Sequence, residues 1–368
     1  MDLSPLRPPF IPWVRVLIGV RGSQVGGPMN EHGAFASPTK VFLAHRATGD
    51  FHSIEELFTN LTRAFPEWVR STVFVAPRTG ANLSSLFANL RWFRSLQGCD
   101  LIHQTGDIHY SILGAWRRPV VLTIHDLRFI EEASGLKRLL FWWFWLYLPC
   151  WRANRVTVIS EFTKSRLVAL GRVGSEKIRV IPNCVAPEFT AQPKPWPSGT
   201  VRVLQVGTTD NKNLSRVMEA CAGLPVHLSI LGKLSDAQRA ELVRRGIDYE
   251  EFRHLHRDQV VALYAACDLV VFVSTYEGFG MPIIEAQAVG RPVITSNLSP
   301  MREVAGQGAL LVDPFDVQGI RSGLLRLLND AGLREELVAA GFRNFRQYSA
   351  SSVALQYAAV YHEVLAQR

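Results

Sequence analysis

The chain has 368 residues, and 48% of them are hydrophobic, which is enough apolar material for two domains of similar size. Its 40 Lys and Arg outnumber 32 Asp and Glu, and the formal charge of +8 favours anionic partners such as nucleotide sugars, lipid phosphates or a membrane surface. Nucleic acid is the weaker explanation, because the chain has no zinc-finger spacing and no basic run with interleaved aromatics. The five scattered cysteines argue against a disulfide framework, indicate a reducing compartment, and are all expected in the core.

The first 38 residues are ambiguous. Val14–Ile18 precedes several glycines, as a strand does in a dinucleotide-binding fingerprint. Pro28, Gly33 and Pro38 interrupt the helix that such a site needs, so we expect no NAD site here. We interpret residues 1–38 as a mobile extension; alternatively, the strand is the first of the domain that follows. No segment has the length of a membrane span, and the first ten residues lack the apolar stretch of a signal peptide.

From residue 39 the chain alternates short apolar segments with amphipathic ones, which predicts two doubly wound α/β domains. The first covers residues 39–186, a proline-rich linker covers 187–200, the second domain covers 201–348, and a helical tail covers 349–368. Expected strands are residues 40–45, 72–76, 101–103, 120–124, 155–159, 201–206, 226–231, 269–273 and 292–295; expected helices are 53–64, one from Ser160, 213–222, 236–245 and 351–365.

One segment, LLFWWFWLYL at residues 139–148, is apolar on every face. Lys137 and Arg138 precede it and Arg152 follows it, and aromatics flanked by cations are typical of a helix at a membrane interface. A helix that is apolar all round is more often buried in a domain of this size, so we expect it in the core. It is too short to span a bilayer.

The stretch YEGFGMPIIE at residues 276–285 carries the strongest functional pattern. It follows the buried strand 269–273, so Glu277 stands at a strand end. Gly278 and Gly280 allow a ligand to approach the main chain, and Pro282 suits the first turn of a helix whose free amides favour a diphosphate. Glu285, about one turn into that helix, can accept hydrogen bonds from ribose hydroxyls, while Glu277 can accept them from a transferred sugar.

This glutamate pair resembles the motif of the retaining GT-B glycosyltransferases of family 4. Other segments similar to that family occur in its order: IHQTGDIHY, VVLTIHDL, VTVISEFTKSRL, IRVIPNCV, VLQVGTTDNKNL and ITSNLSPMREVAG. The resemblance implies two Rossmann-like domains facing a cleft, with the donor in the second domain, the acceptor in the first, and a last helix that crosses back to the first domain. The predicted donor-binding residues are Gly207, Lys212, Glu277, Gly278, Phe279, Gly280, Met281, Pro282 and Glu285.

Lys212 lies in the first strand-to-helix loop of the second domain, at the edge where α/β sheets bind ligands, so we interpret it as a phosphate contact rather than a solvated lysine. Gly207 beside it allows the backbone to approach the ligand. The chain departs here from the familiar family pattern, which often has an arginine several residues earlier. The candidates for a replacement cation are Arg253, Arg257 and Arg302, which the sequence does not rank.

In the first domain, His125 follows a strand and matches a family histidine that faces the transferred sugar. With Glu277 it forms our predicted catalytic pair; the alternative is a histidine satisfied within the core. Asp126 either orients His125 or binds acceptor, and His103 and His109 are candidates for the acceptor side. We expect no metal site, because no His, Cys and carboxylate residues have metal-ligand spacing and Gln104–His109 contains no paired aspartates.

The resemblance therefore implies a metal-independent retaining glycosyltransferase that needs no cofactor besides its nucleoside-diphosphate sugar. It implies transfer to a glycan or lipid-linked acceptor, with bacterial surface polysaccharide assembly as the setting and mannose as the best single guess for the sugar. The cysteines and the absence of a predicted span or signal peptide predict a cytoplasmic protein, either soluble or peripheral at the inner face of the membrane. Two alternatives remain open: a nucleotide-sugar epimerase of the same architecture, and a noncatalytic sugar-nucleotide or membrane-binding component of an assembly complex.

Overall fold

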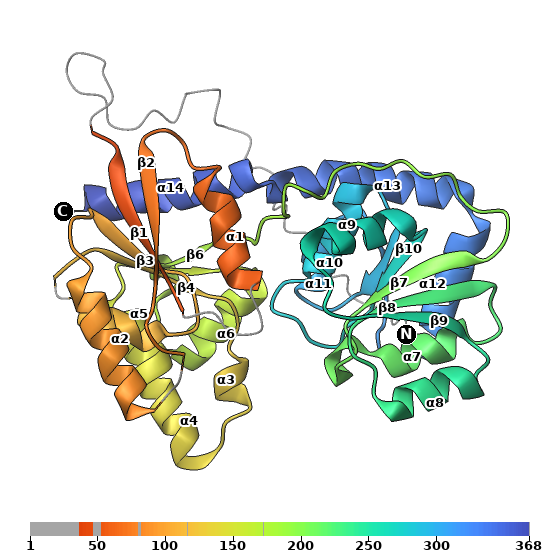
Figure 1. The fold of residues 1–368 in the computed structure, drawn as a ribbon, viewed down its shortest axis with the longest axis horizontal. Helices are drawn as coiled ribbons and strands as arrows, with labels where there is room; N and C mark the ends of the chain where they lie inside the picture. The colour runs from red at the N-terminus through yellow and green to blue at the C-terminus, as the bar shows by residue number, and fades with distance from the viewer. Residues whose placement is uncertain (1–36, 47–52, 80–81, 116, 172, 368) are drawn as a thin grey trace, which may run out of the picture.

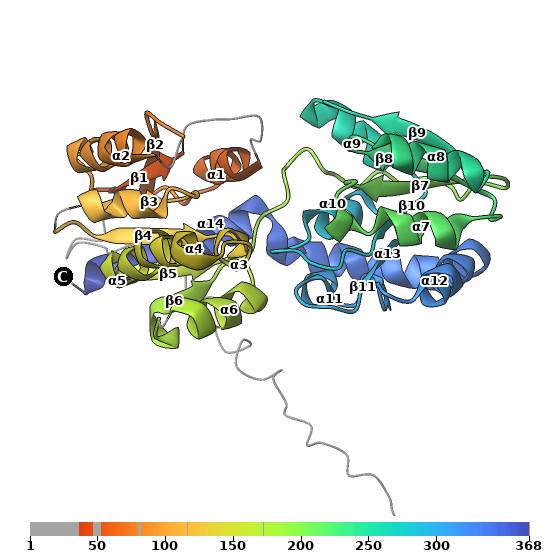
Figure 2. The same ribbon diagram turned by 90° about the horizontal axis from the view of Figure 1, so that it is seen from below.

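A computed structural model describes residues 37–46, 53–79, 82–115, 117–171 and 173–367, and shows two six-stranded parallel sheets with helices on both faces (Figures 1 and 2). The strand orders are β2-β1-β3-β4-β5-β6 and β12-β11-β10-β7-β8-β9. The predicted GT-B fold class is thereby confirmed. The expectations for residues 1–36, including the strand Val14–Ile18, lie outside the described residues.

The first sheet and its helices occupy the first half of the chain. The strands are β1 (Thr39–His45), β2 (Val69–Val75), β3 (Leu101–Gln104), β4 (Val120–Ile124), β5 (Arg155–Val158) and β6 (Ile178–Val180). The helices are α1 (Ser53–Thr62), α2 (Leu83–Ser95), η1 (His109–Gly114), α3 (Arg128–Glu131), α4 (Gly135–Phe141), η2 (Trp142–Tyr147), α5 (Leu148–Arg152), α6 (Glu161–Gly171) and η3 (Ser175–Lys177).

The second sheet also consists of six parallel strands flanked by helices. Its strands are β7 (Val201–Val206), β8 (Val226–Leu231), β9 (Asp248–Phe252), β10 (Leu269–Phe272), β11 (Val293–Ser296) and β12 (Leu310–Val312). The helices are η4 (Asp210–Lys212), α7 (Leu214–Cys221), α8 (Asp236–Arg244), α9 (Arg257–Ala266), α10 (Met281–Val289), α11 (Met301–Ala305), α12 (Val317–Asn329), α13 (Ala331–Phe345), η5 (Arg346–Tyr348) and α14 (Ala350–Ala366).

Burial explains which strands the sequence revealed. β4 and β10 are central strands, and every one of their residues is buried, as parallel strands covered by helices on both faces must be. β9 escaped prediction because it is an edge strand with the sequence DYEEF, which is acidic and only partly buried. Four of the cysteines are buried, whereas Cys99 is only partly buried, so the expectation of five core cysteines is wrong for that residue.

Helix α14 returns from the second half of the chain and packs on the first domain (Figure 1). Tyr357 is buried there against Phe58 of α1 and Tyr361 against Phe65, and the Tyr361 hydroxyl lies 2.8 Å from His103 Nδ1. The last helix therefore completes the core of the first domain, and the chain passes between the domains twice.

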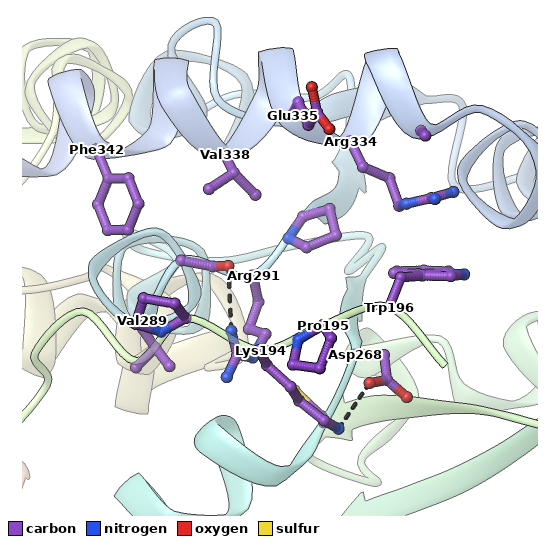
Figure 3. A pocket seen from close by; sticks show the side chains of 15 residues that line it. Lys194, Pro195, Trp196, Asp268, Val289, Arg291, Arg334, Glu335, Val338 and Phe342 are labelled. Carbon is purple, nitrogen blue, oxygen red and sulfur yellow. Dashed lines mark hydrogen bonds and ion pairs between the residues drawn. The ribbon is translucent and has the colours of Figure 1, made fainter. Parts of the chain in front are cut away.

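The linker residues are held against the second domain. Figure 3 shows the cavity of about 400 Å³ between this segment and α13, where Lys194 pairs with Asp268 at 2.6 Å and Arg334 lies over the Trp196 ring at 4.0 Å. The Arg291 guanidinium donates to the carbonyl oxygen of Gln192 at 2.9 Å. These contacts tie the linker to the second domain.

The aromatic segment corrects the sequence interpretation. α4, η2 and α5 form one continuous helix over residues 135–152, in which η2 is a π-helical stretch. Leu146, Pro149 and Cys150 are buried, but Leu139, Leu140, Trp143 and Phe144 are exposed. The segment therefore lies on the surface with one apolar face outward, and the expectation of a core helix is wrong. Among the described helices, none is long and apolar enough to cross a membrane.

Candidate active site

The turn between β10 and α10 positions the predicted donor residues. Gly280 caps the helix with φ +116°, a left-handed conformation that glycine adopts without a Cβ clash, and Pro282 stands in the first turn. Every residue of α10 after Met281 is buried, so the helix is fixed in the core, and Met281 at its amino end lines a cavity between the domains. Phe279 points its ring at Tyr348 in the core, so only its backbone can face a ligand.

Lys212 and Glu277, both predicted to bind the donor, form an ion pair. Their Nζ and Oε1 atoms are 2.5 Å apart, and both side chains are largely buried. Gly207 has φ +89°, and a Cβ there would lie 2.7 Å from Lys212 Cγ, so glycine is required for the lysine to lie across this turn. Asn211 joins the two loops, because its side-chain amide donates to the carbonyl oxygen of Tyr276 at 3.0 Å. A cation and a carboxylate are thus held together at the strand ends.

Glu285 is the most buried carboxylate of the site. Its Oε2 accepts a hydrogen bond of 2.6 Å from the hydroxyl of Tyr264, and its Oε1 lies 3.7 Å from Arg257. Burial raises the pKa of this carboxyl above its usual range, while the Tyr264 hydroxyl and the guanidinium oppose that rise. Arg257 also pairs with Glu56 of α1, so one arginine joins the second domain's glutamate to the first domain.

His125 faces these residues across the domain boundary. A cavity of about 220 Å³ is lined by His125 and Glu56 from the first domain and by Arg257, Met281 and Glu285 from the second. The His125 ring donates from Nε2 to the carbonyl oxygen of Thr105 at 2.9 Å, which fixes its orientation.

Gly278 also lies close to the first domain here. A Cβ on it would lie 3.0 Å from the backbone oxygen of His125, and its own carbonyl oxygen accepts from the Ser160 hydroxyl at 3.0 Å. The predicted residues of the two domains are therefore brought together at this boundary.

The other first-domain candidates have different surroundings. His103 is fully buried, with its ring nitrogens 2.8 Å from the Tyr361 hydroxyl and 2.7 Å from the Thr123 hydroxyl, so its assignment to the acceptor side is wrong. His109 is also buried, and its Nδ1 donates to the carbonyl oxygen of Trp145 at 2.9 Å. Burial lowers the pKa of both histidines.

Asp126 is exposed at the boundary, and its Oδ1 accepts from the Arg128 amide at 3.1 Å. That contact caps the turn into α3, whereas the His125 ring bonds to the carbonyl oxygen of Thr105, so Thr105 rather than Asp126 orients His125 in this structure. Its exposed carboxylate remains available to an acceptor.

The structure also shows which of the three candidate arginines lies at the site. Arg253 pairs with Glu251, and Arg302 pairs with Glu303 on an exposed surface. Only Arg257 reaches the site. Tyr264, which meets Glu285 from the neighbouring helix α9, had no signal in the sequence, because 21 residues separate the pair. Within the described ranges, no group of three or more His, Cys, Asp or Glu side chains is arranged to hold a metal ion.

The arrangement thus provides a lysine and free helix amides for a diphosphate, and carboxylates for sugar hydroxyls.

Comparison with known proteins places the chain among glycosyltransferases. The family model described as Glycosyltransferase Family 4 matches residues 39–189, and the model described as Glycosyl transferases group 1 matches residues 188–344.

Two curated relatives and one solved structure illustrate the similarity. The chain is 28% identical over 221 residues to O-antigen chain mannosyltransferase B of Escherichia coli, covering 54% of this chain and 57% of that protein. It is 28% identical over 349 residues to MMP alpha-(1->4)-mannosyltransferase of Mycolicibacterium hassiacum, covering 85% of this chain and 79% of that one. The crystal structure of Anabaena Alr3699/HepE in complex with UDP and glucose superposes with a TM-score of 0.69 at 17% identity, covering 88% of this chain and 100% of that one, which shows a shared fold. The two family matches together run from residue 39 to residue 344, and the chain belongs to the family 4 glycosyltransferases of GT-B fold.

Proposed function

We propose that this glycosyltransferase is a retaining, metal-independent enzyme that transfers a sugar from a nucleoside diphosphate to a glycan or lipid-linked acceptor. The observation that carries the proposal is the meeting of His125 with Glu285 and Met281 in one cavity between the domains, beside the Lys212–Glu277 pair. No cofactor besides the donor is part of the proposal.

The donor is held by the second domain in this scheme. Its diphosphate binds the free amides at the start of α10 and draws Lys212 away from Glu277. Glu277 then accepts hydrogen bonds from the sugar, and Glu285 accepts them from the ribose. Tyr264 and Arg257 hold the Glu285 carboxylate in place during binding.

Transfer takes place on one face of the sugar. The acceptor hydroxyl approaches from the first domain, attacks the anomeric carbon on the side from which the diphosphate leaves, and passes its proton to a donor phosphate oxygen. Lys212 and the helix amides stabilise the charge that develops on the leaving group. Glu277 and Glu285 are engaged in binding, so neither acts as the nucleophile of a retaining hydrolase. His125 faces the sugar, and the close approach of Gly278 to His125 aligns the two substrates.

Mannose is the sugar we propose, because the names of the two curated relatives specify mannosyl transfer. The name of the first relative specifies an O-antigen chain, and we propose surface polysaccharide assembly on this basis. The structural neighbour solved with UDP supports a nucleotide donor as a class. We also propose that the protein works in the cytoplasm, where its five thiols stay reduced, and that it contacts the membrane peripherally.

The test is proton NMR of the protein with GDP-mannose, with and without a lipid-linked glycan acceptor, in which the signal of the anomeric proton is followed from the first minutes. A retaining transferase releases GDP and forms product with the α configuration of the donor. Inverted product contradicts retention, and a new sugar nucleotide without GDP release identifies an epimerase. If GDP-mannose and the other common sugar nucleotides all stay intact, the protein is a noncatalytic component. Glu277→Gln is expected to abolish turnover, whereas Glu219→Gln, on the surface of the same domain, is the matched control.

A further inference from the structure

The helix formed by α4 and η2 carries an exposed apolar stripe that its own fold leaves uncovered. The stripe consists of Leu136, Leu139, Leu140, Trp143 and Phe144, which are 71%, 51%, 46%, 41% and 45% exposed. Their spacing of three and four residues places them on one face of the helix. A contiguous apolar surface of this kind is unusual on a soluble monomer and indicates an interaction site.

The opposite face of the same helix is firmly packed, so the stripe is not the result of a loosely attached segment. Leu146 is fully buried, Trp145 packs on Tyr110 with ring centroids 4.6 Å apart, and the Trp142 indole donates to the carbonyl oxygen of Leu170 at 2.6 Å. Burial of one apolar face therefore fixes the direction in which the other points.

The helix that carries the stripe has charges of a single sign. Residues 133–160 contain no Asp or Glu, while Lys137 and Arg138 are exposed at the start of the helix. Helix α2 lies on the same lower side of the first sheet in Figure 1 and packs on the same small cluster as Trp145. It adds exposed Leu83 and Phe87, and residues 68–99 also contain no acidic side chain.

We propose that this surface, made of the α4–η2 stripe with its two cations, docks the enzyme on an anionic lipid membrane. Leucine and aromatic side chains that enter the boundary between headgroups and acyl chains bury their apolar area, and Lys137 and Arg138 meet the lipid phosphates. A membrane without net charge can bury the apolar side chains, but it attracts Lys137 and Arg138 less strongly. The chain runs from His125 through α3 directly into α4, so the membrane contact lies on the domain that faces the acceptor.

The proposal rests on the peripheral membrane contact of the proposed function, but not on the sugar or on retention, because membrane docking is measured without turnover. The full-length protein is floated with phosphatidylcholine vesicles, with and without phosphatidylglycerol, at low and high salt. We expect binding to the anionic vesicles that exceeds binding to neutral ones by about tenfold or more and that weakens at high salt.

Two paired variants localise the surface. Leu139→Ser with Phe144→Ser is expected to lower binding by about tenfold or more, since both large side chains lose apolar area at the lipid boundary. Lys137→Gln with Arg138→Gln is expected to remove most of the preference for anionic lipid. Val243→Ser, an exposed apolar residue of α8 in the second domain, is the matched control and leaves binding unchanged. All of these side chains are exposed, and thermal melting checks that the variants stay folded.

Three results would overturn the proposal: a wild-type protein that does not bind anionic vesicles, stripe variants that bind as well as the wild type, or charge variants that keep the full lipid preference. Analytical ultracentrifugation of the same proteins measures whether they self-associate. If the stripe variants abolish a self-association of the wild type while neither protein binds vesicles, the face is a protein interface and the membrane assignment is wrong.

Discussion

Replacing Tyr264 by phenylalanine tests how the buried carboxylate of the site is held. The change removes one hydroxyl and keeps the ring volume, so it deprives Glu285 of the hydrogen bond of 2.6 Å without creating a cavity. A hydrogen bond to a charged group contributes about 1.5–3 kcal/mol, and the guanidinium of Arg257 at 3.7 Å is too distant to replace it. We therefore expect the free energy of unfolding to fall by about 1.5–3 kcal/mol where Glu285 is ionised.

The loss of unfolding free energy in Tyr264→Phe must also depend on pH. Burial raises the pKa of Glu285 in the folded protein, so the native state binds this proton more tightly than the unfolded chain, and stability from that proton is lost as the pH rises through the folded pKa. Loss of the Tyr264 hydroxyl raises this pKa further, because it had stabilised the charged form. The loss of stability is thus largest in alkaline solution, where Glu285 is ionised, and shrinks towards about 1 kcal/mol in acid, where a neutral hydrogen bond is lost instead.

Urea unfolding of wild type and Tyr264→Phe at several pH values measures this difference. Tyr110→Phe is the control, because its buried hydroxyl accepts from the Asn89 amide at 2.8 Å and no carboxylate takes part. Its deficit should be about 0.5–1.5 kcal/mol and independent of pH. If Tyr264→Phe shows the same deficit at every pH, or none, then the hydroxyl does not stabilise a charged Glu285 and the reasoning is refuted.

Three further predictions concern the turn, the domain contact and acid stability. Gly280→Ala forces a Cβ into a residue with φ +116° and 3.0 Å from Ile283 Cδ1, so unfolding free energy should fall by about 1–3 kcal/mol in a urea titration, whereas Gly199→Ala, in open space, should change it by less than about 0.5 kcal/mol. Gly278→Ala places a methyl group 3.0 Å from the oxygen of His125, so the transfer rate should fall about tenfold or more while nucleotide affinity, measured by calorimetry, changes far less; equal losses of both would contradict this. Burial lowers the pKa of His45 to about 4, so protonation favours the unfolded chain, and unfolding free energy should decline by up to about 1.4 kcal/mol per pH unit between about pH 6.5 and 4; His45→Gln should remove that part of the slope, and an unchanged slope would refute it.

Helices and strands could be predicted from the sequence where their residues are uniformly buried, and were missed where buried and exposed residues are mixed. The strands β7 and β8 begin and end where expected, since their apolar runs are bounded by turn residues. The edge strand β9 and the following helix α9 carry too many polar residues to show either period clearly. Arg257 begins α9, so its approach to Glu285 could not be derived without that helix.

The candidate site was predictable where it depends on local geometry. The glycines and proline of the β10–α10 turn predict a ligand site at this strand end, and Lys212 lies in the loop that reaches the same edge. His103 was misplaced because a strand-end histidine can point into the sheet's core, where α14 supplies Tyr361 from the far end of the chain. The aromatic helix was misplaced for a similar reason, since composition cannot tell which apolar face the fold covers.

The measurement that tests the central claim most directly is calorimetric titration of wild type and Glu285→Gln with GDP, UDP, ADP and dTDP, first without metal and then with magnesium. The account predicts that wild type binds one nucleotide far more tightly than the others without metal, and that Glu285→Gln weakens this binding about tenfold or more, as expected for loss of a charged acceptor. Absence of binding to any nucleotide, binding that requires magnesium, or equal affinity in the two proteins would contradict the account.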